Sequence, residues 1–223
     1  MRWIQHFDLF LLDMDGLLVD TERLHFQAYQ TLCSENNQQL PWDFPAYLGV
    51  AHSSHDGLQK ALLPLLGGVD WAPFYERKKA IYQKLLIGGK LGLLPGVAKL
   101  IEELSTTGKK RCVVTHSSKD QVDAIKDALP ALKSIPVWIT REDYDQPKPA
   151  PDGYAKAFEV LADPGDRVVG FEDSLRGLQS LKGTLAMPVL ICDPSHPQMK
   201  SSELEGIHHF TSFTKIPNTF NHI

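Results

Sequence analysis

The chain has 223 residues, of which 43% are hydrophobic and 22% charged, and its formal net charge is -4. This length accommodates one large or two smaller domains with a sizeable core, and the acidic balance argues against a nucleic-acid partner. No apolar run approaches the roughly 18 residues that a membrane-spanning helix needs, and the three cysteines follow no disulfide or metal-binding spacing. We therefore expect a cytoplasmic protein without a nucleic-acid or membrane partner, a monomer with a homodimer as the alternative.

Short apolar runs alternate with longer helical patterns along most of the chain. The runs at 9–12, 112–114, 137–139, 168–171 and 189–192 are typical of strands buried on both faces. Helical patterns occupy 96–107, 118–129, 151–162 and 174–183, and residues 208–213 are a candidate for a last edge strand. This alternation predicts an α/β fold with a Rossmann-like parallel sheet.

The alternation is interrupted between about residues 20 and 91. There the pattern predicts three helices, around 21–34, 54–63 and 73–86, and no convincing strand. Prolines and glycines punctuate the region, among them Pro41 and Pro45. We predict a core domain of residues 1–20 and 92–223 with an inserted α-helical cap domain of residues 21–91.

Asp13 and Asp15 follow the first predicted strand and stand directly before Gly16. Ligands of open α/β sheets bind at this carboxyl edge, and side chains two residues apart on an extended chain point the same way. Both carboxylates can therefore face one space, while the glycine permits a sharp turn. A charged turn with local hydrogen bonds is the alternative for these residues taken alone.

Polar residues of complementary types follow three other predicted strands. They are Thr115, His116 and Ser117 before a helix, Lys148 between two prolines, and the acidic pair Glu172 and Asp173. Each group alone also fits a helix cap or a solvated loop charge. Together, the carboxylates suit Mg²⁺, while the lysine, the hydroxyl and the helix N-terminus suit phosphoryl oxygens. A metal ion between the carboxylates would explain two aspartates beside a buried strand.

Four stretches resemble the motifs of the haloacid dehalogenase-like (HAD) superfamily, and especially of its β-phosphoglucomutase-like phosphatase branch. They are DMDGLLVDTE at 13–22, VVTHSS at 113–118, KPAPDGY at 148–154 and GFEDSLRG at 170–177. The motifs occur in the order of the family, and the resemblance covers nearly the whole chain. Residues 21–91 fall where this branch carries its small cap. The combination is specific, although any one motif alone is not.

The resemblance implies a role for each motif residue. Asp13 would be the nucleophile that forms an aspartyl-phosphate. Asp15 would protonate the leaving alcohol and then activate water. Mg²⁺ would be held by Asp13, by the main-chain carbonyl of Asp15 and by Asp173. The remaining assignments are Thr115, His116 and Lys148 on the phosphoryl group and Glu172 as a supporting acid near the metal.

The resemblance is weaker in the cap. Thr21 matches the hinge where the cap begins, and His25 matches a histidine of the first cap helix. His52 stands roughly where the mutase has an arginine that grips the distal phosphate of its substrate. The cations of residues 77–79 and 84 could compensate, but such a charge run is more often a solvated face.

We therefore expect a Mg²⁺-dependent phosphomonoesterase that acts on a small phosphorylated metabolite, with a sugar phosphate as the favoured substrate. A β-phosphoglucomutase-type hexose phosphate mutase is the alternative, because the same core chemistry with a cap that excludes water transfers the phosphoryl group to a sugar. An inactive regulatory or binding protein of the same fold is disfavoured, because no motif is damaged.

Overall fold

The structure, a computed structural model, describes residues 1–51, 56–67, 69–88 and 91–221. The chain divides into two compact units, one of residues 1–20, 92–194 and 201–223, the other of residues 21–91 and 195–200. Residues 195–200, predicted as part of the core domain, group instead with the helical unit. The assignment of the two units to a core and a cap stays a prediction. No helix within the described ranges is long and apolar enough to cross a bilayer.

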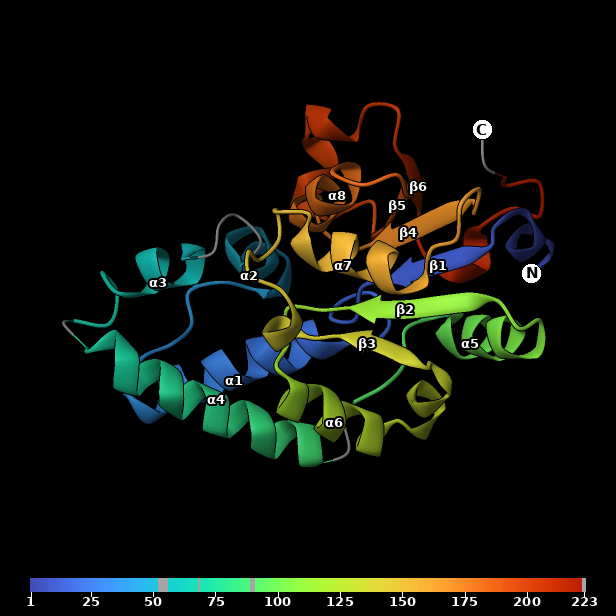
Figure 1. The fold of residues 1–223 in the computed structure, drawn as a ribbon. Coiled ribbons are helices and arrows are strands. Elements are labelled where there is room, and N and C mark those ends of the chain that lie inside the picture. Colours follow the sequence, from blue (N-terminus) through green and yellow to red (C-terminus); the bar gives the residue numbers. More distant parts are fainter. Residues whose placement is uncertain (52–55, 68, 89–90, 222–223) are drawn as a thin grey trace. The chain divides into compact units, whose positions relative to one another are not determined.

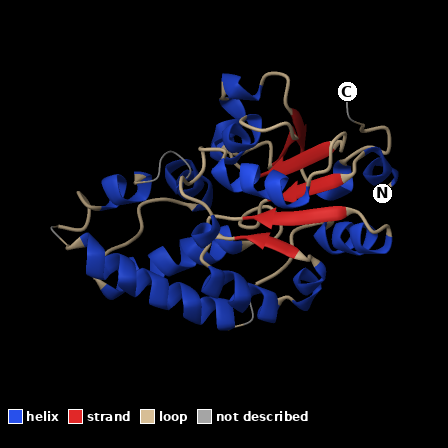
Figure 2. Cartoon of the chain, in the orientation of Figure 1, coloured by secondary structure: helices blue, strands red, loops and turns tan. Residues whose placement is uncertain are grey.

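The first unit is built on one parallel sheet, shown in Figures 1 and 2. Within the described residues six strands follow the order β3-β2-β1-β4-β5-β6, and every pair is parallel. The strands are β1 (Leu9–Leu12), β2 (Lys110–Val114), β3 (Val137–Ile139), β4 (Val168–Glu172), β5 (Met187–Ile191) and β6 (His208–Phe210). The predicted Rossmann-like α/β fold is confirmed, edge strand included. The strand order reverses between β1 and β4, where such sheets bind ligands.

Helices connect the strands and cover both faces of this sheet. They are α5 (Val97–Thr106), α6 (Lys119–Ala128), α7 (Asp152–Leu161) and α8 (Leu175–Lys182). Helix α7 contacts β1, β2 and β3, and its neighbour α8 contacts β4 and β5, so these two helices share one face (Figure 1).

The side chains of β1 alternate between the two faces of the sheet. Leu9 and Leu11 belong to a buried cluster that includes residues of α7 and α8. Phe10 instead lies against Trp3, with ring centroids 6.1 Å apart. Because the alternation has a period of two, Asp13 shares the parity of Leu9 and Leu11. Its carboxylate is therefore directed to the side of the sheet that α7 and α8 cover.

Helix α8 approaches its neighbours closely because small residues recur at every third position. A Cβ atom at Gly177 would lie 1.9 Å from the Glu172 carboxylate, and one at Gly183 would lie 2.6 Å from the proline that precedes α7. Between them, the Ser180 hydroxyl donates a hydrogen bond to the carbonyl of Ala150 at 2.6 Å. These residues bring α8 against the loop that carries Lys148.

In its described parts, the second unit consists of α1 (Thr21–Glu35), α2 (Phe44–Ala51), α3 (Gly57–Leu62) and α4 (Trp71–Ile87). Helix α1 packs along α4, and the short helix Pro197–Lys200 packs against α2.

Helix α2 was not predicted, because Pro41 and Pro45 were interpreted as breakers. Pro45 lies in the first turn of α2, where a missing N–H costs nothing. Asp43 accepts a hydrogen bond from the N–H of Ala46 at 3.0 Å and so caps the helix.

Lys78 departs from the solvated face expected for the charge run of α4. Its neighbour Lys79 is exposed, but Lys78 is only 5% exposed, and its Nζ lies 2.6 Å from Nδ1 of His25. The His25 ring stacks on Tyr82, with centroids 4.1 Å apart. Burial, together with the Lys78 charge, lowers the pKa of His25 to about 3. The neutral imidazole therefore accepts the hydrogen bond of the ammonium.

Candidate active site

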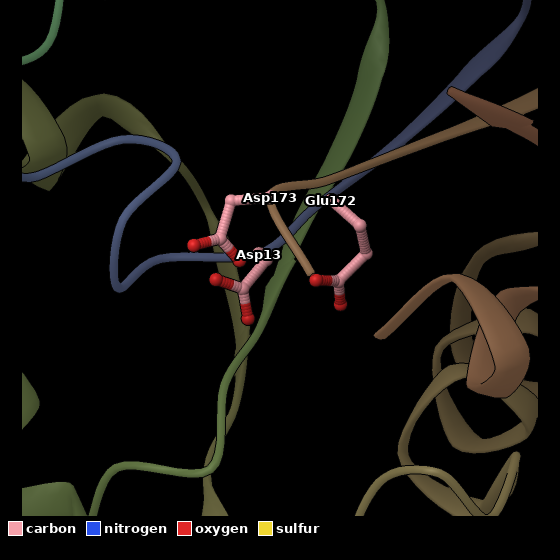
Figure 3. A group of neighbouring side chains, drawn as sticks. All are labelled: Asp13, Glu172 and Asp173. Carbon is pink, nitrogen blue, oxygen red and sulfur yellow. The ribbon is translucent and has the colours of Figure 1, made fainter. Parts of the chain in front are cut away.

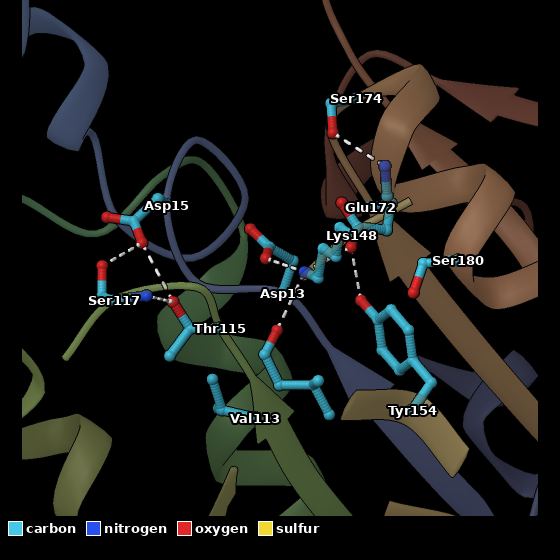
Figure 4. A network of polar contacts seen from close by, with 12 residues as sticks. Asp13, Asp15, Val113, Thr115, Ser117, Lys148, Tyr154, Glu172, Ser174 and Ser180 are labelled. Atoms are coloured by element: carbon cyan, nitrogen blue, oxygen red, sulfur yellow. Dashed lines mark hydrogen bonds and ion pairs between the residues drawn. The ribbon is translucent and has the colours of Figure 1, made fainter. Parts of the chain in front are cut away.

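Lys148 joins carboxylates from two neighbouring strands. Its Nζ donates to Oδ1 of Asp13, to Oε1 of Glu172 at 2.6 Å and to the carbonyl of Val114 at 3.0 Å (Figure 4). Burial alone would lower the pKa of Lys148, but Asp13 and Glu172 outweigh it and raise this pKa, so the amine is charged at neutral pH. A cation is thus fixed between the ends of β1 and β4.

Negative charge exceeds positive charge around Lys148. Asp13 and Glu172 are 6% and 1% exposed. Burial is the main cause that raises the pKa of Asp13 well above its usual range, and Glu172, Asp173 and Asp15 raise it further against the opposing effect of Lys148. Lys148 pairs with Asp13 and Glu172, and Asp173 lies beside these two carboxylates, so within the described residues of this cluster three carboxylates accompany one ammonium and leave an excess of two negative charges when all three are ionised. A divalent cation would balance that excess.

Three carboxylates gather at the end of β1 and β4, as Figure 3 shows. Asp13, Glu172 and Asp173 each offer one oxygen, and these oxygens lie within 4.8 Å of one another. Gly16 makes the approach possible, because its φ is +78° and a Cβ atom there would lie 2.1 Å from Oδ2 of Asp173. Hard oxygen donors at this spacing fit Mg²⁺ better than a softer metal.

Asp15 contacts a different part of the site, at the end of β2. Its Oδ2 accepts hydrogen bonds from Oγ of Ser117 at 2.8 Å and from Oγ1 of Thr115 at 3.1 Å (Figure 4). The N–H of Ser117 in turn donates to Oγ1 of Thr115 at 3.0 Å. The next residue, Ser118, caps α6 by accepting from the N–H of Gln121. Helix capping and contact with Asp15 therefore belong to different residues of one short stretch.

Tyr154 completes the buried network but was assigned no role from the sequence. Its hydroxyl donates to Oε1 of Glu172. Burial, and then the charge of Glu172, raises the pKa of Tyr154 well above its usual range, so the phenol keeps its proton. The one available signal was that a buried tyrosine hydroxyl needs a partner. Ser117 was named only among the polar residues before a helix, and Gly177 was given no role, because no local pattern shows which carboxylate they face.

The structure brings most of the predicted site residues together in the first unit. These are Asp13, Asp15, Thr115, Lys148, Glu172 and Asp173. The side chain of His116 is exposed. Thr21 and His25 belong to the helical unit, where Thr21 is buried and His25 is half-buried. His52 lies outside the described residues.

Residues 7–183 match the haloacid dehalogenase-like hydrolases, and the chain belongs to that family. Within it, the chain falls in the CbbY and β-phosphoglucomutase-like branch. Protein CbbY of Cereibacter sphaeroides is 30% identical over 187 residues, which cover 78% of this chain and 79% of the relative. The predicted superfamily, branch and hydrolase class are thereby confirmed.

Solved structures agree with this assignment. The crystal structure of CbbY from Rhodobacter sphaeroides in complex with xylulose-(1,5)bisphosphate has a TM-score of 0.74 at 26% identity and covers 93% of this chain and 95% of that chain. The β-phosphoglucomutase of Clostridium difficile has a TM-score of 0.69 at 17% identity, with 92% and 91% covered. The second likeness shows the fold alone.

Proposed function

We propose that this protein is a Mg²⁺-dependent phosphomonoesterase that releases phosphate from a small phosphorylated sugar through an aspartyl-phosphate on Asp13. The observation that carries this proposal is the buried bridge of Lys148 between Asp13 and Glu172, beside Asp173. A nucleophile, a fixed cation and a carboxylate set for a divalent ion share one edge of the sheet, as phosphoryl transfer requires.

Two steps would use the two aspartates in turn. Asp13 attacks phosphorus, and the bond between phosphorus and the leaving oxygen breaks as Asp15 gives that oxygen a proton. Asp15 then takes a proton from water as the water oxygen attacks phosphorus and the bond between phosphorus and the Asp13 oxygen breaks. Inorganic phosphate leaves, and both carboxyl groups return to their first state. Lys148 stays charged throughout and stabilises the phosphoryl oxygens.

Asp13, Asp173 and the main-chain carbonyl of Asp15 would hold Mg²⁺, with Glu172 as a supporting acid. When bound, the ion supplies positive charge that offsets the charge on the phosphoryl oxygens and favours ionised Asp13. The Thr115 hydroxyl would bind the phosphoryl group. His116, whose side chain is exposed, would contribute its main-chain N–H.

A sugar phosphate is supported by the relative CbbY, whose crystal structure holds xylulose-(1,5)bisphosphate. We expect water to be the acceptor, because two cations of the proposed cap already have partners within the helical unit. Arg77 makes two hydrogen bonds to Glu35, at 2.9 and 2.7 Å, and Lys78 contacts His25. A mutase must anchor a second phosphate with such cations, so we expect hydrolysis rather than isomerisation.

The test is a panel of phosphorylated metabolites incubated with the purified protein and Mg²⁺. It includes hexose monophosphates, a pentulose bisphosphate and glycerol phosphate, and both inorganic phosphate and isomerised sugar are measured. We expect phosphate release from at least one sugar phosphate, abolished by Asp13→Asn. Isomerisation faster than phosphate release would establish the mutase, and a folded protein that releases no phosphate from any compound would refute the proposal.

A further inference from the structure

Two hydroxyl groups at the end of β2 converge on one oxygen atom of Asp15. Both Ser117 and Thr115 donate to Oδ2, at 2.8 and 3.1 Å. Thr115 is fully buried and Ser117 is 9% exposed. A carboxyl oxygen that accepts two hydrogen bonds is an acceptor, so a proton on this carboxyl group belongs on its other oxygen. The hydroxyl pair thus distinguishes the two oxygens of Asp15.

We infer that Ser117 is a positioning residue, whose hydroxyl holds Oδ2 of Asp15 so that Oδ1 carries the proton exchanged with the leaving alcohol. The inference rests on the proposed function, in which Asp15 is the general acid. General acid catalysis needs the proton within hydrogen-bond reach of the leaving oxygen. A carboxyl group that rotates freely would present either oxygen, whereas one anchored through Oδ2 presents Oδ1.

Ser117 rather than Thr115 is the lasting anchor, because a hydroxyl has one proton to donate. When the Thr115 hydroxyl donates to a phosphoryl oxygen, it no longer donates to Asp15. Ser117 then remains as the donor of the pair. Its main chain is held on both sides, since its N–H donates to Oγ1 of Thr115 and its carbonyl accepts from the N–H of Arg141 at 3.1 Å.

The experiment compares two leaving groups in Ser117→Ala. An alkyl phosphate, such as the sugar phosphate that the wild type hydrolyses, releases a strongly basic alcohol that needs a proton, whereas 4-nitrophenyl phosphate releases a stable anion. The ratio kcat/KM is the measured quantity, because it covers the steps up to departure of the leaving group and excludes hydrolysis of the aspartyl-phosphate. Since a general acid contributes about 10²–10⁴-fold, we expect kcat/KM to fall at least about tenfold for the alkyl phosphate and less than about threefold for 4-nitrophenyl phosphate.

Further variants separate positioning from folding. Ser117→Thr retains a hydroxyl and should recover most of the alkyl phosphate activity, whereas Ser117→Cys, with a weak donor of similar size, should behave as the alanine variant. Ser134→Ala is the matched control, because it removes a hydroxyl that donates to the main-chain carbonyl of Ala131. Thermal unfolding of each variant shows whether it is folded. If the alanine variant does not fold, the cysteine variant replaces it.

Each remaining outcome decides a different question. An equal loss with both substrates, a weaker inhibition by inorganic phosphate in Ser117→Ala, or no loss at all would overturn the positioning role. A folded wild-type protein that releases phosphate from neither substrate would instead refute the proposed function. The two failures are therefore distinguishable.

Discussion

Tyr154 and Lys148 donate hydrogen bonds to the same atom, Oε1 of Glu172. One residue stands at each end of the stretch KPAPDGY, so a single oxygen of β4 ties both the loop and the first turn of α7 to the sheet. Because Glu172 is 1% exposed, neither hydrogen bond is weakened by competing solvent.

Replacing Tyr154 by phenylalanine should remove one of these hydrogen bonds without changing the ring. We expect the free energy of unfolding to fall by about 1.5–3 kcal/mol, the range for hydrogen bonds to charged groups. Unfolding in urea measures this change in the free energy of unfolding. The matched control is Tyr144→Phe, since the Tyr144 hydroxyl donates to the neutral carbonyl of Thr115 at 3.0 Å and should cost about 0.5–1.5 kcal/mol. A Tyr154→Phe protein as stable as the wild type would mean that the Glu172 contact contributes nothing.

Replacing Lys148 by methionine should abolish phosphate release and leave Asp13 and Glu172 without their common cation. Breaking a buried ion pair costs about 3–5 kcal/mol, and Mg²⁺ should restore part of that loss. Thermal unfolding with and without Mg²⁺ measures both effects. Lys110→Met is the control, because its partners Asp163 and Asp166 lie in a more exposed ion-pair group, so its loss should be much smaller. Equal losses in the two variants would contradict the buried bridge.

Exhaustive chelation should abolish phosphate release, and Mg²⁺ should restore it. Ca²⁺, with its looser coordination, should inhibit. A second readout does not depend on turnover, because a bound ion stabilises the folded state by mass action. Mg²⁺ should therefore raise the melting temperature of the wild type but not that of Asp173→Ala. Full activity after chelation would remove the metal from the proposal.

Replacing Gly177 by alanine should displace the Glu172 carboxylate, because the added Cβ would lie 1.9 Å from it. We expect a loss of about 1–3 kcal/mol, as for overpacking in other cores, together with slower phosphate release. The control is Gly92→Ala, where a Cβ would meet no atom within 4 Å. If both variants unfold at the same urea concentration, α8 can shift without cost.

Acid should weaken the helical unit through His25. The pKa of His25 is lowered to about 3, chiefly by burial and then by the Lys78 charge, with Glu22 opposing. Below about pH 6.5 the unfolded chain therefore binds a proton at His25 that the folded chain does not bind. As the pH is lowered, the free energy of unfolding decreases by up to about 1.4 kcal/mol per pH unit. His25→Asn should lose this slope between pH 7 and 5 in urea titrations, whereas the control His6→Asn should keep it. An unchanged slope in His25→Asn would assign the acid sensitivity to other groups.

The strands and the edge that gathers the site were predictable because continuous apolar runs mark strands buried on both faces, and polar residues at their ends meet in any parallel sheet. Asp13, Lys148 and Glu172 could be brought together on that basis alone. The missing helix α2 shows the limit of single-residue signals. Pro45 stops a helix in its interior but suits its first turn, and only the position of the helix start distinguishes the two.

The contacts of Ser117, Tyr154 and Gly177 with their carboxylates could not be predicted for a different reason. Each acts through a carboxylate that is remote in the chain, as Ser117 does through Asp15. A small or hydroxylated residue in a helical or capping pattern is explained locally without such a contact. The orientation of helices α7 and α8 over the sheet decides which groups meet, and this orientation cannot be deduced from the order of residue types along the sequence.

The alternation of β1 restricts how this chain can diverge. One residue inserted between Leu12 and Asp13 would turn the proposed nucleophile toward the Trp3 face and away from Lys148, while composition and fold class stayed almost unchanged. Deletion of one residue has the same effect. We therefore expect relatives that retain catalysis to have no insertion or deletion at this point. In the connection at residues 195–200 the direction of a side chain does not depend on such an alternation. Among active relatives, the length of the chain should be constant at the end of β1 and variable at residues 195–200.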